Sequence, residues 1–167
     1  MNLLFIVLIL AGFDFGGRIA AVYPVGGFGR FHSSSALVGG NIGYSTGPVR
    51  LESGYGYTSL PGHQVSPYLL SFHQLSLSSG YDFAHWADWG FEATAGLGYL
   101  FARRDYGRAR EKGKAGSGEL GVYFFQHTGK SRLSVGLAHT LVFERDGTSG
   151  IAINQFFQIR AGVAYVP

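Results

Sequence analysis

The chain has 167 residues, enough for one domain, and carries 27 glycines, 16 % aromatic residues and only 14 % charged residues. A chain so rich in aromatic residues and so poor in charge is not disordered, and the added glycine favours an all-β fold. The sequence contains no cysteine, which excludes disulfides, thiolate metal sites and a cysteine nucleophile.

The net charge of +3 is concentrated in one segment. Residues 103–114 hold six Lys/Arg and two Asp/Glu, whereas the rest of the chain holds seven Lys/Arg and eight Asp/Glu. The basic pI therefore reflects a local cluster, and it does not predict a general nucleic-acid-binding surface.

The N-terminus predicts an export signal. Residues 3–11 are all apolar, a run too short for a membrane-spanning helix but typical of the hydrophobic region of a signal peptide. Small residues follow, and cleavage after Ala21 places Ile19 and Ala21 at the two recognition positions. We therefore predict a signal peptide at 1–21 and a mature barrel domain at 22–167. The alternative is a buried N-terminal segment.

Alternation of apolar with small or polar residues predicts eight strands after this leader. It is clearest in WGFEATAGLGYLFARR (89–104), where every odd position from Trp89 to Phe101 is apolar. Such a stretch is long for a soluble strand, which has about 5–6 residues, but it suits a tilted crossing of a bilayer, which needs roughly 9–11. The predicted strands are 21–31, 36–45, 49–58, 75–83, 89–101, 119–127, 132–144 and 153–165.

The connections between these strands alternate in length. Short turns are expected at STGP, AHWAD and TGKS, and longer loops at SLPGHQVSP, at the basic stretch from Arg103 to Gly118, and at RDGTSG. Only the first connection, HSSS, departs from the alternation, because it is short at the end where the other connections are long. Short turns at one end and longer loops at the other are typical of outer-membrane barrels.

The two faces of the strands discriminate between two kinds of barrel. One face carries large apolar residues, and the other carries Gly, Ser, Thr, Asn, Gln and a few charges. With the apolar face inward, the chain would be a soluble, lipocalin-like barrel. Its solvated face would then be poor in charge, which is unfavourable for solubility. With the apolar face outward, small residues leave room in a narrow lumen for a few large polar ones. We therefore predict an eight-stranded antiparallel up-and-down transmembrane β-barrel.

Aromatic residues are expected to form two girdles around an aliphatic middle, as in transmembrane barrels. At the short-turn end they are Tyr44, Tyr81, Phe83, Trp89 and Tyr165, and at the loop end they are Tyr55, Tyr57, Tyr99, Phe101 and Phe143.

Three stretches resemble the small outer-membrane β-barrel family typified by the transmembrane domain of outer membrane protein A: 39–58, GFEATAGLGYLF, and the closing QIRAGVAYVP. The resemblance covers the whole mature chain at the level of pattern. It implies a location in the bacterial outer membrane and insertion by the barrel-assembly machinery. Such proteins usually end on an aromatic residue, whereas this chain ends Tyr165, Val166, Pro167.

Charged residues on the inward face must pair or meet water in a narrow lumen. We interpret them as a salt-bridge network that fills the barrel, the alternative being a gate or ion path. They are Arg50, Glu52, Asp82, Glu92, Glu119, Arg132, Glu144 and Arg160.

The basic segment is a candidate contact for lipopolysaccharide or another surface polyanion, because arginine can bind phosphate through two hydrogen bonds. The alternative is a solvated loop tip. Nucleic-acid binding is not expected, since Tyr106 is the only aromatic residue in the segment. The candidate residues are Arg103, Arg104, Arg108, Arg110, Lys112 and Lys114.

No metal site, cofactor or enzymatic activity is expected. The six histidines lack metal-pair spacing, and the pairs His32 with Ser34, His73 with Ser76, and His139 with Glu144 match no catalytic motif. The sequence thus predicts a structural or surface-interaction role in the envelope. The alternatives are a narrow channel or small-hydrophobe conduit, a lipid-modifying enzyme, and a soluble lipocalin-like binding barrel.

Overall fold

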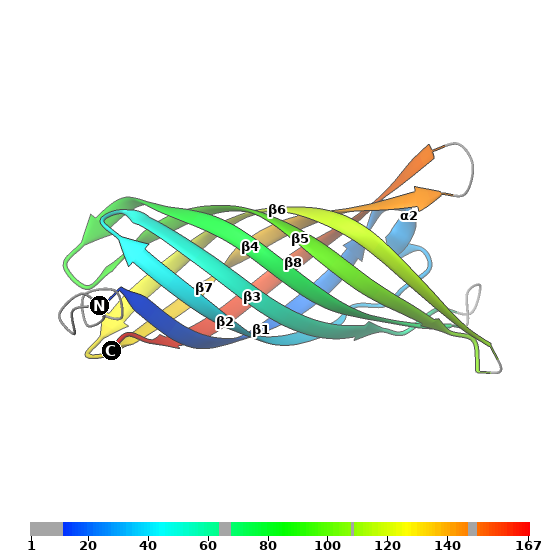
Figure 1. Cartoon of the computed structure of the whole chain (residues 1–167), viewed down its shortest axis with the longest axis horizontal. Coiled ribbons are helices and arrows are strands. Elements are labelled where there is room, and N and C mark those ends of the chain that lie inside the picture. The colour runs from blue at the N-terminus through cyan, green and yellow to red at the C-terminus, as the bar shows by residue number, and fades with distance from the viewer. Residues whose placement is uncertain (1–11, 64–67, 108, 147–149) are drawn as a thin grey trace, which may run out of the picture.

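The computed structural model describes residues 12–63, 68–107, 109–146 and 150–167. Eight antiparallel strands close into a barrel in chain order, so the predicted fold is confirmed (Figure 1). The elements are β1 (Phe13–Val25), α2 (Gly26–Gly29), β2 (Ser35–Thr46), β3 (Val49–Leu60), β4 (Leu69–Trp86), β5 (Trp89–Asp105), β6 (Arg110–Thr128), β7 (Ser131–Asp146) and β8 (Gly150–Tyr165). Among the described residues, no helix is long and apolar enough to cross a membrane.

The register of the strands sets their tilt. Following paired residues from Phe15 on β1 through each strand in turn leads back to β1 at Val25, ten residues further along. With about 3.3 Å per residue and about 4.8 Å between strands, this stagger tilts eight strands by roughly 41°. Each residue therefore rises about 2.5 Å along the barrel axis, and each step to the next strand in the order β1 to β8 rises about 3 Å toward the α2 end.

Three tight turns lie at the same end of the barrel as the start of β1 and the end of β8 (Figure 1). They are centred on Gly47-Pro48, Ala87-Asp88 and Gly129-Lys130, and in each the first central residue has a positive φ. A positive φ at this position is the pattern of type II′ turns, whose twist matches that of antiparallel strands. At the opposite end, the β3–β4 connection is long, as predicted, but the β1–β2 connection, which was predicted to be short, carries α2. The connections after β5 and β7 are shorter than predicted, because strands take up most of the expected loops.

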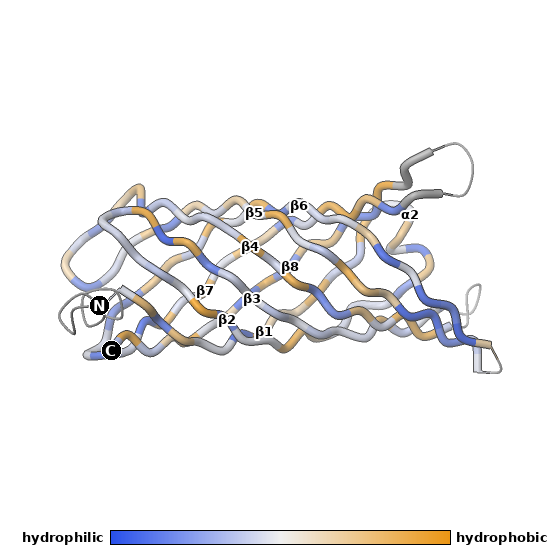
Figure 2. The backbone as a smooth tube through the Cα atoms, viewed as in Figure 1, coloured by the Kyte–Doolittle hydropathy of each residue, from blue (hydrophilic) through white to orange (hydrophobic). Residues whose placement is uncertain are grey.

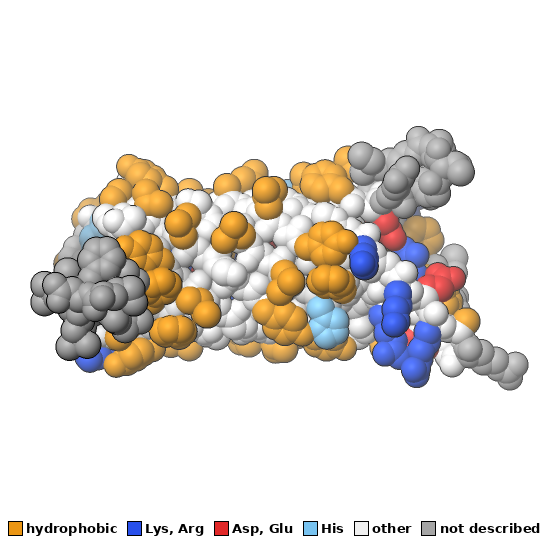
Figure 3. All heavy atoms as spheres, in the orientation of Figure 1, with side chains coloured by type: hydrophobic (Ala, Val, Ile, Leu, Met, Phe, Trp, Pro, Cys, Tyr) orange, Lys and Arg blue, Asp and Glu red, His pale blue; other side chains and the backbone are white. Residues whose placement is uncertain are grey.

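Apolar side chains cover the outside of the barrel wall. On β5, the outward residues alternate with inward ones, and Leu97 at its centre is 74 % exposed. Figure 2 shows this alternation along the strands, and Figure 3 shows the hydrophobic side chains standing on the surface around smaller residues. A surface of this kind is suited to lipid and not to water.

The lumen is divided into a polar half and an apolar half. At the α2 end, ten buried apolar residues contributed by all eight strands form a cluster, against which Phe28 of α2 and Tyr68 pack. Among them, Phe72, Leu100 and Phe156 lie at inward positions. The alternation in the sequence predicts small and polar residues inside, so it does not predict this cluster.

Two predicted boundaries are wrong. The first strand is not 21–31, because β1 runs from Phe13 to Val25 and pairs with both β2 and β8. The stretch from Arg103 to Gly118 is not a loop, because β5 and β6 continue as a hairpin with a connection of four residues, 106–109. Charged residues break the apolar pattern in this stretch, but successive side chains still point alternately outward and inward beyond the apolar belt.

The expected cleavage after Ala21 falls within β1. The apolar run at 3–11 lies outside the described residues, and a signal peptide stays a prediction. A barrel with a complete β1 requires any cleavage to lie before Phe13, because Asp14 and Arg18 both reach into the lumen.

Candidate functional site: the lumen network and the basic hairpin

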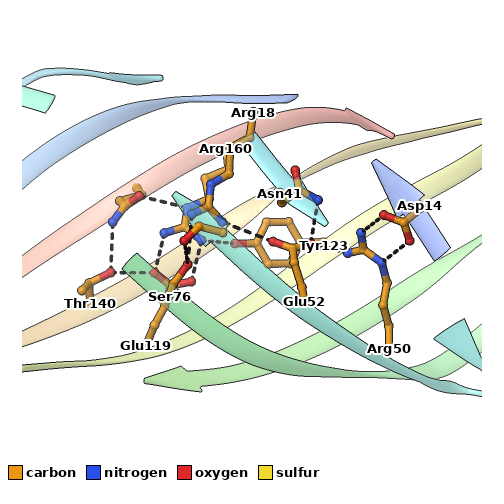
Figure 4. Close-up of polar contacts among 12 residues, drawn as sticks. Asp14, Arg18, Asn41, Arg50, Glu52, Ser76, Glu119, Tyr123, Thr140 and Arg160 are labelled. Atoms are coloured by element: carbon orange, nitrogen blue, oxygen red, sulfur yellow. Dashed lines mark hydrogen bonds and ion pairs between the residues drawn. The ribbon is translucent and has the colours of Figure 1, made fainter. Parts of the chain in front are cut away.

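The centre of the polar half is an arginine–glutamate pair (Figure 4). Arg160 on β8 donates from Nη1 to Oε1 of Glu119 over 2.5 Å and from Nη2 to Oε2. Tyr123 and Gln158 occupy two further donors of Arg160, at 3.0 and 2.9 Å, and Thr140 donates to Glu119 over 3.1 Å. Arg160 is only 5 % exposed, and these contacts satisfy a charge that would otherwise be costly to bury.

A second chain of ion pairs joins β1 to β3 (Figure 4). Arg50 lies with Nη2 2.6 Å from Oδ1 of Asp14 and donates from Nε to Oδ2 over 3.1 Å. Its Nη1 donates to Oε2 of Glu52 over 2.5 Å, and the other oxygen of Glu52 lies 3.3 Å from Arg18. Carboxylates and guanidinium groups thus alternate across the lumen.

A third cluster lies nearer the tight turns. Arg132 on β7 pairs with Glu92 at 2.9 Å and with Asp82 at 3.8 Å. Its guanidinium also lies over the ring of Phe125, 4.3 Å from the centroid, where a cation–π contact forms. The three clusters together balance four arginines against five carboxylates.

Glycines provide the space that these side chains occupy. A Cβ on Gly43 would lie 2.6 Å from both carboxylate oxygens of Asp14 and from Nη2 of Arg50. A Cβ on Gly136 would lie 2.6 Å from the ring of Tyr123. The high glycine content therefore follows from a narrow barrel that encloses large polar side chains.

The structure brings seven of the eight predicted interior charges into these clusters and leaves Glu144 apart. Glu144 pairs with Arg104 at 2.7 Å, on the far side of the apolar cluster. Asp14 and Arg18 were missed because they fell in the predicted leader. The signal was present, since Asp14 and Arg18 alternate in FDFGGRIAA with outward Phe15 and Ile19.

The apolar half closes the lumen toward the α2 end. Phe28 of α2 contacts Phe156 edge-on at 5.0 Å, and the buried His32 lies beside Phe28 and forms a hydrogen bond of 3.1 Å with the Tyr68 hydroxyl. Desolvation lowers the pKa of His32, so the neutral ring is favoured there. The polar half encloses a void of about 60 Å³ and the apolar half one of about 40 Å³. Side chains therefore fill the middle of the lumen, and a hollow of about 420 Å³ lies at its tight-turn end, beside Asp14, Arg50 and Arg132.

The basic residues of the β5–β6 hairpin divide between its two faces. Arg104 points inward to Glu144, whereas Arg103, Arg110, Lys112 and Lys114 are exposed. Arg108 lies outside the described residues. Figure 3 shows the exposed cations grouped at one end of the apolar belt, and Figure 2 shows the ends of β5 and β6 as strongly hydrophilic.

Asp105 is the acidic partner within this group. It accepts from Arg110 over 3.2 Å and from Arg103 over 3.4 Å. A backbone hydrogen bond from Gly107, followed by the charges of Arg110 and Arg103, lowers the pKa of Asp105. The carboxylate therefore stays ionised in mildly acidic solution.

The predicted girdle residues lie on the outer wall. Nine of the ten are among the exposed large hydrophobic residues, and Tyr44 is half-buried against Phe13, with ring centroids 5.1 Å apart. Trp89 stacks on Trp86 at 4.7 Å in the β4–β5 turn region.

The histidines singled out in the sequence find other partners. His73 contacts the hydroxyl of Tyr55 at 2.5 Å, and His139 contacts Gln155 at 3.3 Å on the outer wall. Within the described residues, no hydrogen bond joins a histidine to a serine side chain, and no cluster of acidic, histidine or cysteine residues could hold a metal.

No family model matches the sequence, and no curated protein matches it closely. Solved structures do match. Neisserial surface protein A superposes with a TM-score of 0.75 at 14 % identity, over 93 % of this chain and 97 % of that one. The N-terminal β-barrel domain of Pseudomonas aeruginosa OprF gives 0.62 at 16 % identity, over 91 % and 96 %. Ail of Yersinia pestis, in complex with the heparin analogue sucrose octasulfate, gives 0.51 at 11 % identity, over 92 % and 95 %.

The chain has the fold of the small outer-membrane β-barrels. This fold and the apolar outer wall together place it in a bacterial outer membrane, with its strands across the bilayer.

Proposed function

We propose that the chain is an outer-membrane barrel with a closed lumen whose basic β5–β6 hairpin contacts a polyanion at the outer surface. The observation that carries this proposal is the set of exposed cations on a hairpin that continues past the apolar belt. Insertion by the barrel-assembly machinery belongs to the same proposal.

The filled lumen supports a structural and surface role over a conduit. Passage from the polar half to the α2 end would require the ion-paired clusters and the buried apolar cluster both to part. We propose no catalytic step. His73 contacts the hydroxyl of Tyr55 and His139 contacts the amide oxygen of Gln155, so neither histidine acts as a base for a serine nucleophile.

The charge of the hairpin supports the polyanion contact. Four outward cations lie beside two carboxylates: Asp105, which is already engaged by Arg103 and Arg110, and the exposed Glu111, which accepts a hydrogen bond from Tyr106. The complex of Ail with sucrose octasulfate shows that a barrel of this fold can bind a polyanion, and it supplies a soluble probe.

Binding of sucrose octasulfate to the folded chain in a zwitterionic detergent tests the proposal. We expect binding that weakens as salt rises and that is lost when Arg103, Arg110, Lys112 and Lys114 are all changed to glutamine. A control changes two cations outside the hairpin, Arg30→Gln and Lys130→Gln, and should bind as the parent does. The proposal fails if the parent shows no salt-sensitive binding, or if the hairpin variant binds equally well. Planar-bilayer conductance tests the closed lumen, and we expect no channel current.

A further inference from the structure

The outward cations of the hairpin lie at a defined height on the barrel wall. Lys114 is the register partner of Phe101, and Lys112 is the register partner of Arg103. All four residues are exposed on the outer wall, and Gly113 between the lysines faces the other way. Arg103 and the two lysines therefore form a basic stripe directly beyond the aromatic girdle at this end.

The tilt and stagger of the barrel give the distance of the stripe from the girdle. Lys114 lies about 3 Å above Phe101 along the barrel axis, Arg103 about 5 Å and Lys112 about 8 Å. The headgroup layer of a bilayer extends roughly 5–8 Å beyond the hydrocarbon core on each side. The stripe therefore coincides with the depth of lipid headgroups, and it does not project into the surrounding water.

The stripe also contains a repulsion that a bound anion would relieve. Arg103 and Lys112 are directly opposite each other on neighbouring strands, and like charges in such a pair are destabilising. Within the described residues, no ion pair involves Lys112 or Lys114. Arg103 has a long contact of 3.4 Å with Asp105, and its side chain is 47 % exposed.

We propose that Arg103, Lys112 and Lys114 bind the phosphate of a lipid in the outer leaflet, while Tyr99 and Phe101 below them pack against its acyl chains. This inference rests on the proposed function and names the source of the polyanion as the surrounding membrane. Aromatic rings at the edge of the hydrocarbon and cations in the headgroup layer match the two parts of such a lipid.

The test measures binding of fluorescent bis-phosphorylated lipid A to the folded full chain in zwitterionic detergent micelles. The stripe variant carries Lys112→Gln and Lys114→Gln, and the matched control carries Arg30→Gln and Lys130→Gln, with the same loss of charge. A gel shift on boiling shows that each variant is folded. We expect the stripe variant to bind about 25-fold more weakly, since each cation near an anionic surface contributes roughly fivefold. The control should stay within about threefold of the parent.

Equal losses in the stripe variant and the control overturn the inference, because the attraction would then follow net charge alone. Unchanged binding by the stripe variant also overturns it. If either result occurs while sucrose octasulfate still binds to the hairpin, the lipid site fails and the proposed function stands. If the parent binds neither probe, the proposed function itself fails.

Discussion

The arginine–glutamate pair at the centre of the lumen gives the sharpest energetic prediction. Glu119→Gln keeps the shape of the side chain but leaves Arg160 charged and buried, close enough to Arg18 for the two guanidinium groups to repel. A glutamine offers one oxygen, so it cannot accept both Arg160 bonds and the Thr140 bond that Glu119 accepts. Breaking a buried pair in this way costs about 3–5 kcal/mol of unfolding free energy.

The double variant separates the pair from the residues around it. Combining Glu119→Gln with Arg160→Gln removes both charges, so we expect the double variant to be more stable than the sum of the single losses by at least about 2 kcal/mol. Urea titration in phosphatidylcholine vesicles, followed by the fluorescence of Trp86 and Trp89, measures all four proteins. Additive losses below about 1 kcal/mol each would refute the reasoning, because they would mean that water screens the pair.

Three further predictions follow from the fold. Deleting residues 1–21 removes most of β1 and should abolish the heat-modifiable barrel on refolding gels, whereas deleting 1–11 should preserve it; equal refolding of both would contradict the position of β1. Phe156→Ala opens a cavity in the apolar cluster and should cost about 3–5 kcal/mol in urea unfolding, and a loss below about 1 kcal/mol would show that the cluster is loosely packed. Ala87→Gly relieves a positive φ of 47° and should stabilise the barrel by up to about 1 kcal/mol, in contrast to Ala84→Gly, which should destabilise it.

The barrel could be predicted from the sequence because its outer wall is lipid-facing. In β5 every odd position from Trp89 to Phe101 is apolar, whereas the even positions are small or polar except for Leu100, and one such strand already indicates which face meets the membrane. The tight turns could be predicted because short stretches of turn-forming residues mark them in the sequence.

The errors occur where two signals overlap. β1 was missed because its apolar residues follow directly after the apolar run at 3–11, and a leader and a strand look alike at that junction. The apolar cluster was missed although Phe156 alternates in step with the inward Gln158 and Arg160, so the strand pattern already placed it inside. Leu70 and Phe72 lie on a part of β4 that was not predicted as a strand.

The sequence also does not reveal that the basic residues of 103–114 divide between the outer and inner faces of the barrel. Arg103 and Arg104 are neighbours in the sequence, but one faces outward and the other pairs with Glu144 from β7. Composition counts both as members of one positive cluster. Their separation depends on β5 continuing as a strand beyond the apolar belt, which the charges themselves obscure.

Expression of the full chain in a Gram-negative host, followed by membrane fractionation and gels of boiled and unboiled samples, tests the central claim most directly. A closed transmembrane barrel predicts a band in the outer-membrane fraction that migrates differently once it is boiled. A band in the soluble periplasmic fraction with the same mobility before and after boiling would contradict the account.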